Sequence, residues 1–281
     1  MPESVLLAAA LWAYLLAALA ALSTVAPVLL LPPSAHRRRG TAAAGPWPLG
    51  LLWLAVTLHL AALALRWQRL GHGPFTTLHE ILSSNLWSLA LVLSCAAAAL
   101  REVRAALPLA MPVLLLLAGW LLLSPPEPGH LPPTYSTVLL YLHSLTGKVY
   151  LGLLLVAVTL ALVPLAASTP ALAAAWRAPP WCRSEALAHR FAAFAFVAET
   201  LMLVAGAVWA QDAWGRWWAW DPLETWAFAS WLALALWLHA RVTKRRSPQA
   251  LGIGLALVFC LAFLTFFGVP FVSTSPHKGA V

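Results

Sequence analysis

The stretch from Val138 to Val163 reads VLLYLHSLTGKVYLGLLLVAVTLALV and contains a single formal charge, on Lys148. A helix of about 20 predominantly apolar residues can cross roughly 30 Å of hydrocarbon, so this stretch predicts a membrane-spanning helix. Seven further apolar runs flank it, and together they predict an all-α integral membrane protein with about eight transmembrane helices. The predicted spans are residues 5–31, 49–67, 78–100, 107–123, 138–163, 188–210, 223–242 and 250–269.

The composition supports one polytopic membrane domain over residues 1–281. Of the 281 residues, 62% are hydrophobic and 9% are charged, which is too few charges to cover the surface of a soluble domain of this length. The net charge of +8 does not indicate nucleic-acid binding, because the basic residues form short clusters between the apolar runs. The three cysteines form no Cys-x-x-Cys pair, which argues against a thiol-exchange module or a zinc site.

The distribution of lysine and arginine predicts which way the spans run. Loops after the first, third, fifth and seventh spans carry twelve of these residues, whereas the opposite side carries four. Cytoplasmic loops of membrane proteins carry the excess of positive charge, so we expect both termini on the periplasmic or external side. The many passes place the chain in contact with a lipid bilayer, and the expected location is the bacterial inner membrane.

Two predicted spans begin with a sequence typical of a capping box, in which a side-chain oxygen accepts a hydrogen bond from a free helical N–H group. One runs from Thr77 to Glu80 and the other from Asp221 to Glu224. The second also has Pro222 at the first helical position, where a proline costs least.

Residues 209–226, called the Trp segment below, contain six of the sixteen tryptophans and lie between the sixth and seventh predicted spans. An interfacial aromatic belt is one interpretation, but such belts are spread over all spans at both interfaces. Here the tryptophans are concentrated in one external loop, in which Gly215 allows a turn. A dense surface of indole rings beside the membrane suits a large, flat, hydrophobic ligand that can stack on it.

The sequence WGRWWAWDPLETWAF, from Trp214 to Phe228, resembles the WGxxWxWD signature of the haem-handling (WWD) family of cytochrome c biogenesis. Within this family the chain is similar to the CcsA (ResC) proteins, the integral-membrane half of the system II cytochrome c synthase. The resemblance extends over the last four spans and touches residues 71–80. It implies that the Trp segment is a WWD loop that presents haem b.

The resemblance also implies three histidine ligands to haem iron. His143 and His277 match the two external ligands, and His239, near the internal end of the seventh span, matches a transmembrane ligand. His239 lies about 27 Å below Asp221 at 1.5 Å per helical residue, so it implies a second, internal haem site. The alternative for each of the three is an ordinary interfacial side chain.

The remaining expected haem contacts are residues of the Trp segment: Trp214, Trp217, Trp218, Trp220, Asp221 and Arg216. Asp221 is also readily explained as the N-cap of the seventh span, and Arg216 as a partner of a haem propionate. Lys148, inside a span, needs a partner such as a propionate or Glu199, or must extend its amine to water. The fourth iron ligand is left open between His59 and a partner chain.

The resemblance implies that the chain carries haem from the cytoplasmic to the periplasmic side. There it would present haem for thioether attachment to the Cys-x-x-Cys-His motif of an apocytochrome c. A CcsB (ResB)-like membrane subunit would be its partner in a holocytochrome c synthase complex, and a thiol-reducing partner is compatible with this role. No catalytic residue of the chain is evident. A haem exporter, or a CcmC-like haem-delivery protein without synthase activity, is the alternative.

Overall fold

The computed structural model describes residues 2–25, 46–131, 135–168, 181–243 and 246–272, and in these ranges the chain is helical without strands. Two short helices, α8 (Val163–Ala166) and α13 (Val269–Val272), follow α7 and α12. The eight long helices are α1 (Pro2–Leu22), α4 (Trp47–Leu70), α5 (Leu78–Ala99), α6 (Arg101–Leu123), α7 (Val138–Ala161), α10 (Trp181–Trp214), α11 (Pro222–Thr243) and α12 (Pro248–Phe267).

The prediction of an all-α membrane protein is confirmed. Seven of the eight long helices among the described residues are long and apolar enough to span a membrane. The eighth, α11, is not counted with them; Glu224, His239 and Arg241 and its tryptophans make it more polar. Each predicted span coincides with one long helix, although residues 26–31 of the first span lie outside the described residues.

Three helices have boundaries that differ from the prediction. Helix α1 ends at Leu22, and residues 23–25, inside the predicted first span, form a turn. Helix α6 begins at Arg101 rather than at residue 107, because Pro108 and Pro112 are accommodated inside it. Leu100 alone joins α5 to α6, so the expected basic loop is the first turn of a helix. Helix α10 has 34 residues and is longer than its predicted span at both ends.

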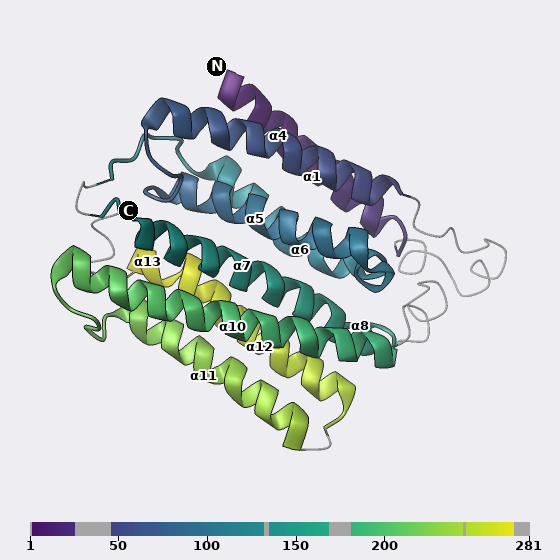
Figure 1. Ribbon diagram of the computed structural model, residues 1–281. Helices are drawn as coiled ribbons and strands as arrows, with labels where there is room; N and C mark the ends of the chain where they lie inside the picture. Colours follow the sequence, from purple (N-terminus) through teal and green to yellow (C-terminus); the bar gives the residue numbers. More distant parts are fainter. Residues whose placement is uncertain (1, 26–45, 132–134, 169–180, 244–245, 273–281) are drawn as a thin grey trace.

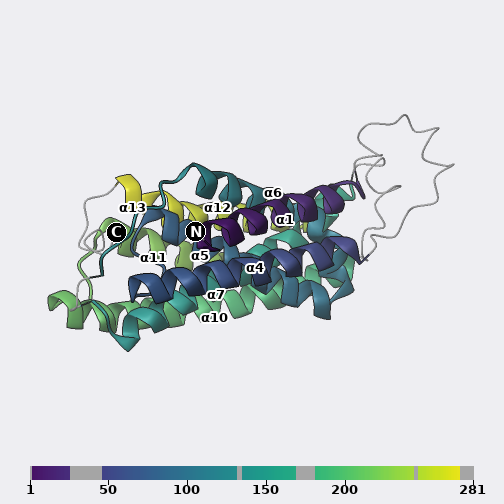
Figure 2. The ribbon, with the colours of Figure 1, turned by 90° about the horizontal axis from the view of Figure 1, so that it is seen from above.

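The long helices lie side by side and alternate in direction, with α1 and α4 at one edge of the bundle and α11 at the other (Figures 1 and 2). Helix α1 packs on α4 and α6, whereas α11 packs on α10 and α12. Helix α7 lies between these groups, in contact with α5, α6, α10 and α12. It is the most buried of the seven apolar helices, so the stretch that defines the fold lies at its centre.

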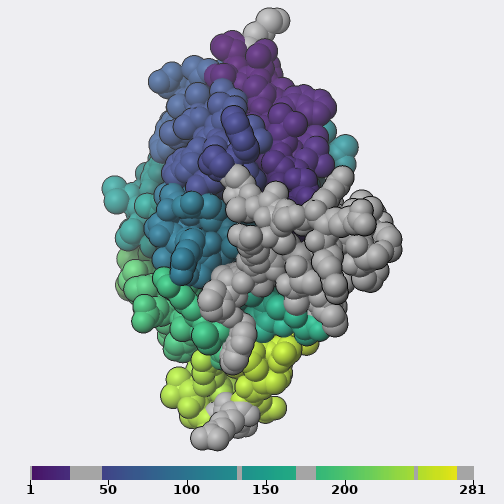
Figure 3. Space-filling model, turned by 90° about the vertical axis from the view of Figure 1, so that its right-hand side faces the viewer, coloured from purple at the N-terminus to yellow at the C-terminus, as the bar shows by residue number. Residues whose placement is uncertain are grey.

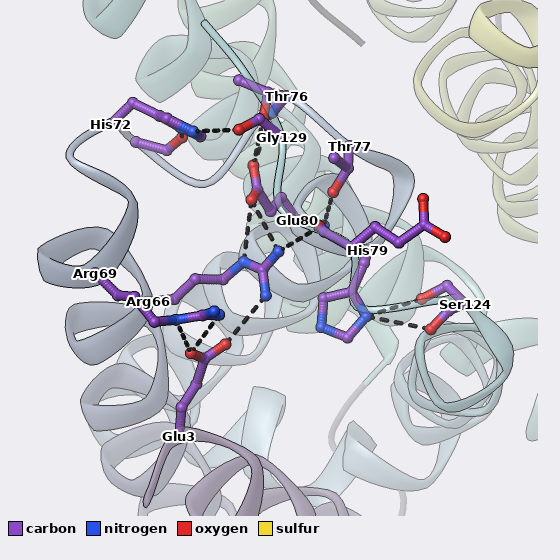
Figure 4. Close-up of polar contacts among 12 residues, drawn as sticks. Glu3, Arg66, Arg69, His72, Thr76, Thr77, His79, Glu80, Ser124 and Gly129 are labelled. Carbon is purple, nitrogen blue, oxygen red and sulfur yellow. Dashed lines mark hydrogen bonds and ion pairs between the residues drawn. The ribbon is translucent and has the colours of Figure 1, made fainter. Parts of the chain in front are cut away.

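A network of ion pairs joins three helices at the end of the bundle that carries the Trp segment (Figure 4). The buried Arg66 of α4 donates from Nε to Glu80 Oε1 of α5 over 3.0 Å, and from Nη1 to Glu3 Oε1 of α1 over 3.0 Å. The backbone N–H and hydroxyl of Thr76 donate to Glu80 Oε2 over 3.0 and 2.7 Å. The predicted cap is also present, since Thr77 Oγ1 accepts from Glu80 N. These contacts fix the segment that leads into α5.

A second buried network lies deeper in the same half of the molecule. His59 of α4 is fully buried, and Tyr14 Oη of α1 lies 3.3 Å from its Nδ1. The other ring nitrogen, Nε2, lies 2.8 Å from Ser83 Oγ of α5. Both nitrogens therefore have partners within the helix bundle.

Figure 3 shows the opposite end of the bundle, called the basic end below. Arg183 of α10 forms an ion pair with the buried Glu102 of α6 over 2.8 Å, and Arg241 of α11 pairs with Glu185 of α10 over 2.8 Å. Arg101 and Arg104, in the first turn of α6, lie at the same end. The bundle thus separates the Trp segment from these basic residues by the full length of its helices.

Candidate functional site

The Trp segment consists of the end of α10, a turn from Gly215 to Asp221, and the start of α11. The turn needs left-handed backbone at two residues, Gly215 with φ of 76° and Trp220 with φ of 56°. Glycine adopts this conformation without strain, whereas a tryptophan rarely does. Asp221 Oδ1 accepts from Glu224 N over 2.9 Å, and Glu224 Oε2 accepts from Asp221 N over 3.3 Å. The predicted capping box at the start of α11 is present, with Asp221 as its N-cap.

A pocket of about 220 Å³ lies directly beside this turn. Side chains from α5, α7, α10, α11 and α12 line it, together with the segment before α5, so the last half of the chain supplies most of its wall. Its lining residues are Phe75, Ile81, Asn85, His143, Ser144, Gly147, Lys148, Met202, Leu203, Gly206, Ala207, Trp218, Leu223, Glu224, Ala227, Thr265, Phe266 and Pro270. We call this the His143 pocket.

The imidazole of His143 is held in a defined orientation within this pocket. Its Nδ1 donates a hydrogen bond to the backbone oxygen of Met202 on α10 over 2.9 Å. This bond places the ring proton on Nδ1 and the lone pair on Nε2, which is how a histidine that ligates a metal is usually held. The ring also stacks on Trp209, with centroids 6.2 Å apart and an interplanar angle of 15°.

Gly206 allows this position of the His143 ring. A Cβ atom at residue 206 would lie 2.7 Å from His143 Nδ1, which is closer than real Cβ contacts allow. The absence of a side chain at residue 206 therefore lets the imidazole lie against the backbone of α10.

Trp218 forms the wall of the pocket nearest to the Trp segment. Its Nε1 is buried and has no hydrogen-bond partner in the part of the chain that the structure describes. On its other side, Trp218 lines an apolar groove of about 420 Å³ on the surface of α10 and α11. Trp220, Phe228 and Trp231 line the same groove. Trp218 therefore separates the His143 pocket from an apolar surface that faces out of the bundle.

The other predicted contacts of the Trp segment lie elsewhere. Trp214 packs against Tyr135 and Trp209, with ring centroids 6.0 and 5.0 Å away. Trp217 and Trp220 are 57% and 67% exposed, and Arg216 is also exposed. Of the predicted contacts in this segment, Trp218 is the one among the lining residues of the His143 pocket.

The predicted histidines are distributed over the length of the molecule. His239 is exposed near the basic end of α11, far from the His143 pocket along the helix axis. His277 lies outside the described residues. His59 is not among the lining residues of the His143 pocket, and both of its ring nitrogens are engaged by Tyr14 and Ser83. Its contacts assign His59 to the packing of α1, α4 and α5.

The pocket also contains residues that sequence reasoning did not single out. Asn85 of α5 is buried; its Nδ2 donates to Ile81 O, and its Oδ1 has no partner among the described residues. An amide inside a span is a signal that could have identified it. Met202 and Phe266 offered no such signal, because apolar residues in an apolar span look alike.

The fold and the pocket define a polytopic helical membrane protein with an aromatic turn over a histidine-containing cavity. The model of the Cytochrome C assembly protein family matches residues 75–277, which include the Trp segment and almost every element of the pocket. The chain belongs to the cytochrome c assembly protein family and is of the CcsA type.

Three proteins to which the chain is similar carry the name CcsA. The chain is 41% identical over 92 residues to "Cytochrome c biogenesis protein CcsA" of Guillardia theta, a match that covers 33% of this chain and 31% of that protein. The protein of the same name from Prochlorococcus marinus (strain MIT 9301) is 40% identical over 94 residues, covering 34% of this chain and 30% of the relative. These matches span about a third of each relative's length. The Chlamydomonas reinhardtii CcsA is 27% identical over 238 residues, covering 82% of this chain and 67% of its own.

A solved structure shares the arrangement of the helices. "Cytochrome c Heme Lyase CcmF" superposes with a TM-score of 0.69 at 20% identity, covering 99% of this chain and 47% of that one. At this identity the likeness supports the fold alone.

Proposed function

We propose that this cytochrome c assembly protein binds haem b in the His143 pocket and presents it beside the Trp segment for covalent attachment to apocytochrome c. One observation carries the proposal: His143 of α7 and Trp218 of the Trp segment line one pocket, although they are far apart in sequence. The density of tryptophans predicted a stacking surface in the Trp segment, and the family resemblance implied that His143 is an iron ligand.

The chemistry of the pocket fits a haem group. His143 holds its Nδ1 proton against Met202 O, which leaves the nitrogen that ligates iron on the opposite side of the ring. Phe75, Phe266 and Trp218 supply apolar and aromatic walls for a flat ring. The buried, unpartnered Nε1 of Trp218 and Oδ1 of Asn85, among the described residues, indicate that something polar completes this pocket. His277, as a second axial ligand, stays a prediction.

Holding the ligand in place would be the main contribution of the chain. Thioether formation adds a cysteine S–H group across a haem vinyl group, so the reaction consumes no oxidant. No described residue of the pocket is a nucleophile or an acid–base pair aimed at such a bond. Positioning reacting groups in contact distance can itself lower a barrier by several kcal/mol. We infer that the chain would act as a scaffold that orients haem, with His143 and Trp218 among the residues that would hold it.

The placement in the cell and the partners belong to the same proposal. The excess of basic residues at the end opposite the Trp segment supports a cytoplasmic basic end and an external Trp segment in a bacterial inner membrane. A CcsB-like membrane subunit would complete the synthase and supply any missing ligand. The exposed His239, near the basic end, would mark a second haem site on the path from the cytoplasm.

The test is the variant His143→Ala with His130→Ala, an exposed loop histidine, as its matched control. We expect His143→Ala to lose haem from the purified protein and to abolish cytochrome c maturation, and added imidazole to restore part of both. Retention of haem and maturation at the wild-type level would contradict the proposal. A wild-type protein that binds haem through His143 but supports no thioether formation with a CcsB-like partner would favour the haem exporter or CcmC-like alternative.

A further inference from the structure

Lys148 is a cation inside the membrane-spanning part of the protein, on the wall of the His143 pocket. It lies in α7, five residues from His143 in the direction of the basic end, which is about 7.5 Å deeper along the helix axis. Its Nζ donates one hydrogen bond, to Ser84 Oγ of α5, over 2.8 Å. The ammonium group is thereby held inside the bundle instead of extending to the membrane surface.

Neither acidic side chain that could serve as a partner forms an ion pair with Lys148. Glu199 of α10, the protein partner considered from the sequence, accepts from Ser230 Oγ of α11 with Oε1, while its Oε2 has no hydrogen-bond partner among the described residues, and Glu199 does not line the His143 pocket. Glu224 lines the same pocket, but its Oε2 accepts from the backbone N–H groups of Ala219 and Asp221 over 2.7 and 3.3 Å. Among the described residues Lys148 forms no ion pair within 4.0 Å, whereas Arg66, Arg183 and Arg241 do.

A charge inside a membrane-spanning bundle without a counter-charge is costly, and it usually marks a functional site. The rest of the pocket specifies what that ligand must be. Its walls are largely apolar, and its one histidine is His143, so the ligand combines a large apolar body with a negative group. An ammonium N–H with no acidic partner prefers a carboxylate over any neutral acceptor.

We propose that Lys148 binds a carboxylate of the ligand in the His143 pocket, a haem propionate if haem is the ligand, and so determines which edge of the ring points toward the Trp segment. The inference rests on the proposed function. The propionates and the vinyl groups occupy different edges of the haem ring. If His143 held the iron and Lys148, which follows His143 toward the basic end of α7, held a propionate, the vinyl-bearing edge would point outward, toward the Trp segment. Lys148 is a positioning residue in this scheme.

The test compares haem b with haem dimethyl ester, in which both carboxylates are blocked, on wild-type protein purified in an uncharged detergent. The dissociation constants are measured by absorption titration. We expect the wild-type protein to bind haem b roughly 10- to 100-fold more tightly than the ester, the range for a hydrogen bond to a charged group. Lys148→Met should bind both compounds with the affinity of the wild-type protein for the ester, while Lys148→Arg should keep part of the preference.

The absorption spectrum supplies a second readout. Because His143 still ligates the iron in Lys148→Met, the haem band of the saturated variant should match that of the wild-type protein. The proposal is overturned if the wild-type protein binds the ester as tightly as haem b, or if Lys148→Met keeps the wild-type preference. Failure of the wild-type protein to bind haem b at all, or binding that His143→Ala leaves unchanged, would instead overturn the proposed function itself.

Discussion

The two halves of the helix bundle treat their buried polar side chains differently. In the half formed by α1, α4, α5 and α6, Arg66 pairs with Glu80 and Glu3, and both nitrogens of His59 have side-chain partners. Two oxygens of this half have no partner among the described residues: Oδ1 of Asn85, which lines the His143 pocket, and Oε2 of Glu102. In the half formed by α7, α10, α11 and α12, Lys148 lacks an acidic partner and Trp218 Nε1 lacks an acceptor among the described residues. Both of these groups line the His143 pocket.

Leaving a polar group unpartnered in a membrane costs free energy, so we expect substitutions in the two halves to affect different properties. The partnered groups of the first half stabilise the packing of its helices, and their loss should lower stability. The groups of the second half face the pocket, so their loss should change ligand binding first. Four substitutions test this comparison, in order of decreasing expected effect.

Arg66→Met should cause the largest loss of stability. It leaves Glu80 buried and without its counter-charge, and removing one partner of a buried ion pair typically costs about 3–5 kcal/mol. The measurement is thermal unfolding of the haem-free protein in detergent. Arg69→Met is the matched control, because Arg69 also pairs with Glu3 but its side chain is 55% exposed. We expect the control to lose at most about 1 kcal/mol. Equal stability of the two variants would contradict the structural role of Arg66.

Gly206→Ala should disturb the pocket half by displacing the ring of His143. The added methyl group would lie 2.7 Å from His143 Nδ1, and overpacking of this kind costs about 1–3 kcal/mol. Because the ring of His143 is displaced, we expect the purified Gly206→Ala protein to retain less haem than the wild-type protein. Gly119→Ala, in α6, has nothing within 4 Å of its new Cβ and should gain helix stability of up to about 1 kcal/mol. Wild-type haem retention in Gly206→Ala would show that His143 does not need this position.

His59→Leu sharpens the contrast between the two buried histidines. It leaves the hydroxyls of Tyr14 and Ser83 without their hydrogen-bond partner. A buried polar group left without a partner lowers the free energy of unfolding by about 1–3 kcal/mol. The haem content per folded molecule should stay at the wild-type value, measured by absorption against protein concentration. A stable variant that has lost haem would make His59 a ligand after all.

Asp221→Asn should have the smallest effect. Asparagine caps a helix about as well as aspartate, so the hydrogen bond to Glu224 N survives. Asp221→Leu removes the cap and should cost about 1 kcal/mol, visible as a lower unfolding temperature. If Asp221→Asn keeps its stability and haem but fails in cytochrome c maturation, the carboxylate has a chemical role beyond capping.

The helices were predictable because membrane thickness fixes the length of an apolar run, whatever its neighbours. The boundaries of α6 and α10 were not, since Pro108 and Pro112 are tolerated inside one helix and ion pairs extend the other. The capping boxes were predictable from Thr77 and Asp221, because a cap depends on residues adjacent in sequence.

The candidate site was predictable only in part. The motif identified the Trp segment but not the tryptophan that turns inward. That choice depends on the left-handed backbone at Gly215 and Trp220, and the sequence pattern does not specify this conformation. Trp218 thus lines the pocket while Trp217 stays exposed. The apolar walls gave no signal, because a helix that is apolar all round has no periodicity to show its inner face.

The unusual length of α10 provides a depth scale for the membrane. Its 34 residues extend about 51 Å, well beyond the roughly 30 Å of a hydrocarbon layer. Arg190 and Gln211 bracket a mostly apolar stretch of about 31 Å, so the surplus turns stand in the headgroup layer at the basic end. Met202, which holds His143, then lies about 13 Å inside the layer that Gln211 bounds. At that depth the apolar groove beside Trp218 would lie against the lipid chains.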